Sequence, residues 1–184
     1  MKVWSILPES VYLKLMENDI LICDRLEYTD IEFRRAYHWM RNQMNKRLET
    51  AYRDRFPLWV WIHHGTKSGK PDLRESHLGI KGSINYCVEF DIPEKDILQS
   101  DFSLWHCVLG DWYLASSEEE STEYDTQLKL YGNTPELEHK KIQSWECIFD
   151  IGITNDWIGT GTTQGCVWEF KKSEIKNSQR FIAR

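Results

Sequence analysis

Residues 84–109 constrain the fold more than any other stretch, because they contain a strand and a helix start in succession. Residues 86–92 (YCVEFDI) have the composition of a buried strand, which Pro93 ends. Ser100 and Asp101 then precede an aromatic segment in the pattern of a helix N-cap, and we expect a short helix at 102–109 that carries His106. A strand followed this closely by a helix predicts a fold that mixes the two, with a ligand site near their junction.

Three longer segments predict the main helices. Residues 8–18 carry an apolar stripe after Pro8, and residues 29–48 repeat apolar side chains at helical spacing behind a capping box of Thr29 and Glu32. The third helix begins at 134–135 and runs to 149. Short apolar runs predict strands at 3–6, 20–23, 56–63, 166–170 and 180–182. We therefore predict an α+β fold: one compact domain over residues 1–184, of short, mainly antiparallel strands with about three main helices.

An acidic segment interrupts this pattern. Residues 116–125 (SSEEESTEYD) combine four glutamates and one aspartate with small polar side chains. We expect an exposed acidic loop here, within a surface insertion that spans residues 111–133. The chain contains no convincing linker, so the insertion belongs to the single domain.

Charge, cysteine content and hydropathy narrow the classes of function. The net charge of −6 disfavours sequence-independent nucleic-acid binding over a broad surface. Five cysteines, an odd number without a C-x-x-C pair, indicate reduced thiols and a cytoplasmic location rather than a disulfide framework. No apolar run is as long as a membrane span, so we expect no membrane insertion.

Two apparent motifs lack features that their chemistry requires. The loop 65–71 (GTKSGKP) has the wrong glycine spacing for a phosphate-binding loop and a proline where a Ser or Thr is needed. His63 and His64 are adjacent on a predicted strand, so their side chains point to opposite faces. No paired cysteines or H-E-x-x-H accompany them, and we therefore predict no metal site.

Aromatic residues offer a candidate binding surface. The chain contains nine Trp, and Trp59 and Trp61 alternate along one predicted strand. Such side chains either pack in the core or stack against a flat ligand such as a nucleotide base.

Several cations are candidates for binding phosphate. Arg34, Arg35 and Arg41 share the polar face of the second helix, which is either a solvated face or a contact for a nucleotide or a nucleic-acid backbone. Arg74 either pairs with Asp72 or binds a ligand phosphate.

Two residues are candidates for catalysis. His106 follows the helix start at Asp101, where it could act as acid, base or orienting donor. Glu169 lies in the predicted strand 166–170, where a carboxylate is either exposed at an edge or directed into a cleft.

Many of these segments together resemble an uncharacterised bacterial family, domain of unknown function 3841. The matching stretches follow one another along nearly the whole chain: 3–6 (VWSI), 36–40 (AYHWM), 59–61 (WVW), 70–74 (KPDLR), 100–106 (SDFSLWH), 144–150 (SWECIFD) and 164–169 (QGCVWE). This resemblance implies no particular activity.

The opening of the chain, VWSI with its helix and then ILICD at 20–24, is also similar to ADP-ribosyltransferase-like domains. That similarity implies an NAD-binding cleft between two small antiparallel sheets, with a late-strand glutamate that orients the nicotinamide ribose. It assigns Glu169 as the carboxylate and His106 as a nearby acid, base or ribose donor. Trp4, Ser5 and Arg74 would line the nucleotide, with Trp59 and Trp61 beside them.

Two departures from the transferase pattern are visible. The His or Arg usual in the first strand is absent, and Cys166 stands where a Gln-x-Glu pattern has its glutamate. We expect an NAD-using ADP-ribosyltransferase-like protein of bacterial defence, counter-defence or toxin type. The alternative is a non-catalytic binding module, which would hold nucleic acid through Arg34, Arg35 and Arg41, or a protein partner.

Overall fold

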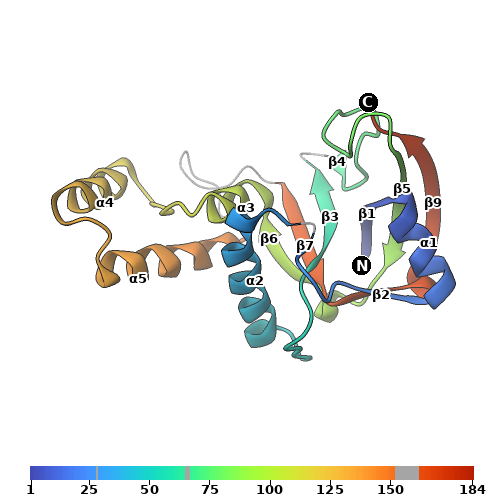
Figure 1. The fold of residues 1–184 in the computed structure, drawn as a ribbon, viewed down its shortest axis with the longest axis horizontal. Helices are drawn as coiled ribbons and strands as arrows, with labels where there is room; N and C mark the ends of the chain where they lie inside the picture. The colour runs from blue at the N-terminus through green and yellow to red at the C-terminus, as the bar shows by residue number, and fades with distance from the viewer. Residues whose placement is uncertain (28, 65–66, 152–161) are drawn as a thin grey trace.

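The structure, a computed structural model, describes residues 1–27, 29–64, 67–151 and 162–184, without the side chains of residues 63, 64, 67 and 68. The interpretations of the His63 and His64 side chains and of Gly65 lie outside this description. Within it, the chain combines α-helices with antiparallel strands (Figure 1), which confirms the predicted α+β class.

The strands form two sheets in which every described pairing is antiparallel. The larger sheet has the order β6 (Leu98–Asp101), β7 (Thr163–Val167), β3 (Leu58–His64), β1 (Lys2–Pro8), β5 (Ile84–Asp91) and β9 (Ile175–Ile182), with β4 (Lys67–Ser68) paired to β3. The smaller sheet pairs β2 (Ile20–Ile22) with β8 (Glu169–Lys171).

Five α-helices lie in the described part of the chain, more than the three main helices and one short one that we predicted. They are α1 (Glu9–Asn18), α2 (Arg34–Arg47), α3 (Phe102–Leu109), α4 (Glu118–Tyr131) and α5 (Pro135–Ser144). Four 3-10 turns accompany them: η1 (Ile31–Phe33), η2 (Glu94–Asp96), η3 (Trp145–Phe149) and η4 (Lys172–Glu174).

Side chains from opposite faces of the larger sheet enter two cores, as strand alternation requires. Cys166 of β7 packs with Trp39, Trp105 and Trp145 in a core formed with α2, α3 and η3. Its neighbour Val167 joins a second core that the other face forms with α1. Figure 1 shows α2 and α3 beside the β6–β7 end of the sheet and α1 beside β5 and β9.

The acidic segment is a helix rather than the loop that we predicted. The Ser117 side chain accepts a hydrogen bond from the backbone N–H of Glu120, and three glutamates occupy the first turn of α4. Capping and the favourable interaction of acidic side chains with the helix dipole stabilise a helix at this position.

The start of α2 also differs from prediction. A 3-10 turn precedes α2, and Phe33 N–H donates to the Asp30 carbonyl; the Asp30 side chain makes no capping hydrogen bond. The capping box predicted from Thr29 and Glu32 is therefore wrong, because backbone groups satisfy the first turn. Asp19, which follows the last residue of α1, has a left-handed backbone conformation with φ 63°.

The predicted strand 166–170 is in fact two strands. β7 ends at Val167, and β8 begins at Glu169 in the smaller sheet. Trp168 lies between them and is buried, and its indole N–H donates to the Thr50 carbonyl at 2.8 Å. The chain therefore changes sheet at Trp168, and Glu169 does not continue the alternation of β7.

The start of α3 agrees with prediction. The Asp101 carboxylate accepts hydrogen bonds from the backbone N–H groups of Ser103 and Leu104, at 2.8 and 2.9 Å. Gly110 follows the last turn. This cap fixes the position of the helix that carries Trp105 and His106.

We predict that Asp101→Ala lowers the free energy of unfolding by about 1 kcal/mol, because two N–H groups at the helix start lose their acceptor. Asp101→Asn should retain most of that stability, since the amide oxygen can still accept. Urea unfolding of both variants tests this. An Asn variant as unstable as the Ala variant would contradict the capping role.

Candidate functional site

The residues nominated from the sequence do not form one site. Trp59, Trp61 and His106 line one cavity, and Glu169 lines another. Trp4 and Ser5 lie within the larger sheet, and Arg74 lies on an exposed loop.

The first cavity, called here the aromatic cavity, has a volume of about 210 Å³. Residues of β3, α2, α3 and β7 form its walls: Tyr37, Trp59, Val60, Trp61, Phe102, Trp105, His106 and Gln164. Trp59 and Trp105 lie with ring centroids 4.8 Å apart, and Tyr37 meets both of them edge-on. Aromatic side chains therefore provide flat surfaces in several orientations.

Strand register explains why these residues meet. Trp61 pairs with Trp4 on one side and with Gln164 on the other, and Gln164 pairs with Ser100. Residues paired across neighbouring strands project on the same face of a sheet. One row across four strands therefore leads from Trp4 to the aromatic cavity.

The cavity has polar groups at its wall. His106 Nδ1 lies 2.9 Å from the Phe102 carbonyl, so Nδ1 donates and Nε2 is the acceptor in the neutral ring. Gln164, 5% exposed, donates through its amide nitrogen to the Ser100 hydroxyl at 3.4 Å. Its carboxamide oxygen is an acceptor at the cavity wall.

Two indole N–H groups are buried without a hydrogen-bond partner among the described residues, those of Trp4 and Trp59. Burial raises the pKa of the neighbouring Tyr37 hydroxyl, and the nearby Trp59 N–H opposes that rise. The Trp59 N–H nevertheless has no hydrogen-bond geometry to the Tyr37 oxygen. Buried polar groups are usually satisfied, so an unpaired donor at a cavity wall favours a ligand acceptor there.

Trp4 and Ser5 cannot contact one ligand on the same face, because successive strand residues point to opposite faces of the sheet. Trp4 lies beside Trp61, whereas the Ser5 hydroxyl donates to the Trp59 carbonyl at 3.0 Å. Ser5 therefore connects β1 to β3 from the other face.

Arg74 lies at the surface and pairs with Asp72, with Nε to Oδ1 at 2.8 Å and Nη2 to Oδ2 at 2.5 Å. This pairing, mainly the hydrogen bonds from Arg74, lowers the pKa of the Asp72 carboxyl. Of the two alternatives for Arg74, the structure contains the pair with Asp72.

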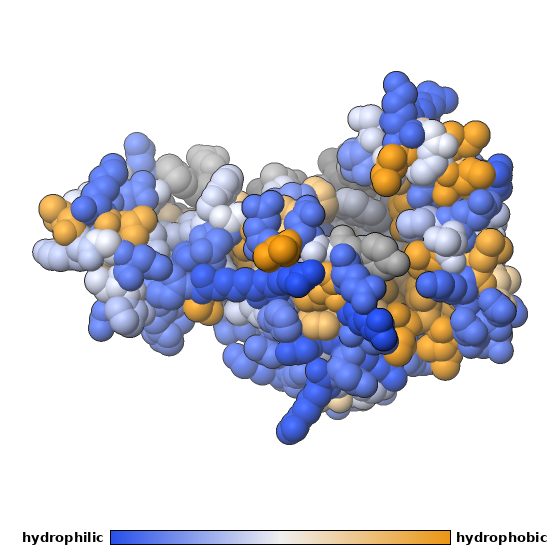
Figure 2. All heavy atoms as spheres, viewed as in Figure 1, coloured by the Kyte–Doolittle hydropathy of each residue, from blue (hydrophilic) through white to orange (hydrophobic). Residues whose placement is uncertain are grey.

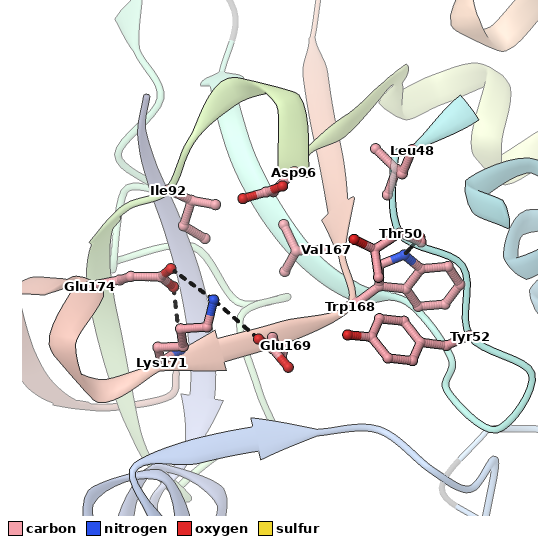
Figure 3. Close-up of a pocket in the computed structure, with 10 residues that line it drawn as sticks. All are labelled: Leu48, Thr50, Tyr52, Ile92, Asp96, Val167, Trp168, Glu169, Lys171 and Glu174. Atoms are coloured by element: carbon pink, nitrogen blue, oxygen red, sulfur yellow. Dashed lines mark hydrogen bonds and ion pairs between the residues drawn. The ribbon is translucent and has the colours of Figure 1, made fainter. Parts of the chain in front are cut away.

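The second cavity, called here the carboxylate pocket, has a volume of about 270 Å³ (Figure 3). Its lining combines three carboxylates, one ammonium group, two aromatic rings and aliphatic or small side chains: Leu48, Thr50, Tyr52, Ile92, Asp96, Val167, Trp168, Glu169, Lys171 and Glu174. Figure 3 shows Lys171 between Glu169 and Glu174, and the rings of Tyr52 and Trp168 on the other side of Glu169.

Ion pairs hold Glu169 in this pocket. Arg55 donates to it at 2.6 Å while stacking over the Tyr52 ring, and Lys171 pairs with it at 3.1 Å. Burial opposes ionisation of Glu169, but the hydrogen bonds from Arg55 and Lys171 outweigh it and lower its pKa. Burial raises the pKa of Glu174, which pairs more loosely with Lys171 at 3.7 Å.

His106 and Glu169 are therefore on different cavities. The linings of the two cavities share no residue, and the chain bends at Trp168 between Gln164 and Glu169. A single small ring bound in the aromatic cavity does not bring both groups to the same atom.

Sequence reasoning missed several residues that shape the two cavities. Tyr37 has the helical spacing of a core residue, and Phe102 and Trp105 follow a cap, so their patterns signalled packing only. Arg55 and Glu174 stand in connections without periodicity. No local signal identifies them, because their contacts depend on segments distant in the sequence.

Metal-binding clusters and membrane-spanning helices are both absent from the described residues. No cluster of three or more His, Cys, Asp or Glu side chains there is arranged to hold a metal ion. No helix in the described part of the chain is long and apolar enough to cross a membrane.

We predict that Arg55→Met destabilises the protein at pH 7 by about 1–3 kcal/mol, because a charged hydrogen bond to Glu169 is lost. The folded pKa of Glu169 is lowered, so this stabilisation is present above the unfolded value of about 4.3 and is lost as the pH falls through the folded pKa. The penalty should therefore shrink in acid. In acid, the remaining destabilisation should come only from the lost stacking of Arg55 on the Tyr52 ring.

Urea unfolding at pH 7 and in mild acid measures both parts of this prediction. Arg53→Met is the matched control, because that side chain is exposed and makes no ion pair within the described residues. A penalty for Arg55→Met that is equal at both pH values would show that the ion pair does not contribute.

Comparison with known proteins places the chain in a family. No curated protein and no solved structure matches it. One family model, described as a domain of unknown function (DUF3841), matches residues 2–176. That match covers nearly the whole chain, so the protein belongs to the DUF3841 family.

Proposed function

We propose that the protein is an NAD-binding domain of ADP-ribosyltransferase-like type, and that the nicotinamide ring of NAD enters the aromatic cavity. One observation carries this proposal: the cavity combines flat aromatic walls with the carboxamide of Gln164 and the imidazole of His106. Pockets for small ligands typically have mostly apolar walls and a few convergent polar groups.

Nicotinamide fits these features chemically. It is a flat aromatic ring that can stack on indole surfaces such as those of Trp59 and Trp61. Its carboxamide has both a donor and an acceptor, so it can pair with the oxygen of Gln164 and with the unpaired Trp59 N–H. The volume of about 210 Å³ suits one ring rather than a whole dinucleotide, which would extend out of the cavity.

The proposal of a transferase step rests on the resemblance to ADP-ribosyltransferase-like domains. It does not rest on a cavity that contains both proposed catalytic residues. In such chemistry, a carboxylate stabilises the positive charge that develops on the ribose as nicotinamide leaves. Glu169 is the proposed carboxylate and His106 the proposed acid or base, but they line different cavities.

We predict that millimolar NAD raises the midpoint of thermal unfolding. At about a hundred times the dissociation constant the gain is roughly 2.7 kcal/mol, or roughly 5–10 °C for a chain of this size. Trp61→Leu should remove most of the shift, whereas Trp112→Leu, a matched change at an exposed indole, should not. No shift with the unaltered protein would remove the proposal.

We predict that Glu169→Gln preserves the NAD-induced thermal shift, because Glu169 lies outside the aromatic cavity. Loss of nicotinamide release in this variant, with the shift preserved, would identify Glu169 as the carboxylate. Chromatographic quantification of nicotinamide measures release. Release at the original rate would remove Glu169 as the carboxylate.

A non-catalytic binding module is the second candidate, and the ion pairs of Glu169 with Arg55 and Lys171 favour it. NAD binding without nicotinamide release by the unaltered protein would select it. The nucleic-acid form of this candidate has less support. Arg35 pairs with Asp111 and Glu138, and Arg41 donates to a backbone carbonyl and stacks over Phe56.

A further inference from the structure

A helical arm, residues 111–144, projects away from the two sheets. Figure 1 shows α4 and α5 extending beyond α2 and α3 at one end of the molecule. α4 buries only Tyr124 among its residues, and the ring of Tyr124 stacks on Tyr113 at 4.1 Å. The arm is connected to α2 by Arg35, which pairs with Asp111 and Glu138.

Large apolar side chains of the arm are exposed to solvent. Trp112 is 64% exposed, Leu130 is 68% exposed and Tyr131 is 72% exposed. Figure 2 shows hydrophobic residues at this end of the molecule, surrounded by hydrophilic ones. Clustered apolar side chains rimmed by polar residues are typical of protein–protein contact sites.

A groove of about 490 Å³ on the arm has Trp112 in its wall. Trp112, Tyr124 and Leu128 form its apolar part, and Asp111 and Asp125 are among its polar residues. It is large enough for one apolar side chain of a partner, the kind of anchor that contributes most to protein interfaces.

The charge of the arm specifies the chemistry of that partner. α4 contains five acidic residues and one lysine, Lys129. The ammonium group at the groove, Lys141, is already neutralised by Asp111 at 2.6 Å and Glu138 at 3.2 Å. Complementary potentials steer association and suppress wrong partners, so the surface favours a cationic partner.

The same charge argues against other occupants. Nucleic acid and anionic lipid would be repelled by α4. A second copy of the chain has a net charge of −6, and its basic α2 face already uses Arg35 within the molecule.

We propose that the arm is a docking site for a basic segment of a partner protein, which places one large apolar side chain in the groove and its cations along α4. The site is separate from the aromatic cavity and does not depend on NAD binding. Tyr124 is the only buried residue of α4, so this helix contributes mainly an exposed surface to the molecule.

A synthetic peptide tests the proposal. The probe is a fluorescein-labelled amphipathic helix of lysine and leucine, and the control peptide has glutamate in place of lysine. Fluorescence anisotropy should show saturable binding of the lysine peptide to the full-length protein and none of the control. Absence of lysine-peptide binding, or equal binding of both peptides, overturns the proposal.

Matched variants locate the contact. Glu123→Lys/Asp125→Lys on the arm should weaken binding about tenfold or more, whereas Glu17→Lys/Glu94→Lys, the same charge change on the body, should change it less than about twofold. Trp112→Ser should weaken binding, whereas Ile80→Ser, at a residue 83% exposed outside the arm, should not. Equal weakening by arm and body variants would mean non-specific attraction and overturns the proposal.

Two controls distinguish loss of the docking site from misfolding and from self-association. Circular dichroism should show unchanged helix content in the arm variants, and each should keep the thermal-unfolding midpoint of the unaltered protein. Sedimentation equilibrium should show no concentration-dependent association. Dimerisation that Trp112→Ser abolishes would identify a second copy as the occupant and overturn the assignment to a basic partner.

Discussion

The change of sheet at Trp168 is the constraint on which both cavities depend. β7 lies between β3 and β6, and so positions Gln164 beside Trp61 and Ser100. A single residue, Trp168, separates β7 from β8, whose pairing with β2 positions Glu169. Burial of the Trp168 ring and its hydrogen bond to the Thr50 carbonyl fix the bend between the two strands.

The two cavities differ in what they can stabilise. The aromatic cavity offers polarisable surfaces and neutral polar groups, which suit a flat uncharged or delocalised ring. The carboxylate pocket instead contains charged side chains, and Arg55 and Lys171 pair with Glu169 and favour its ionised form. A carboxylate with this many partners is a strong structural element, and its use in catalysis would require that a ligand displace at least one of them.

Local signals in the sequence predicted the elements whose ends are determined locally. Asp101 caps α3 and Thr134 caps α5, because each side chain accepts from backbone N–H groups within its own first turn. Local capping also explains why the loop predicted for the acidic segment is wrong. Ser117 and the glutamates after it form a helix start, although the acidic composition of the segment is typical of a loop.

The sequence by itself determined the α+β class, the alternation of Trp59 and Trp61 along β3, and the family to which the chain belongs. Only the tertiary structure decided that Trp4, Trp61 and Gln164 form one row, that Ser5 faces away from it, and that Glu169 and His106 line different cavities. The physical reason is that helix caps and strand alternation arise between near neighbours in the chain. Strand order and register instead arise from pairing between distant segments, which no local pattern encodes.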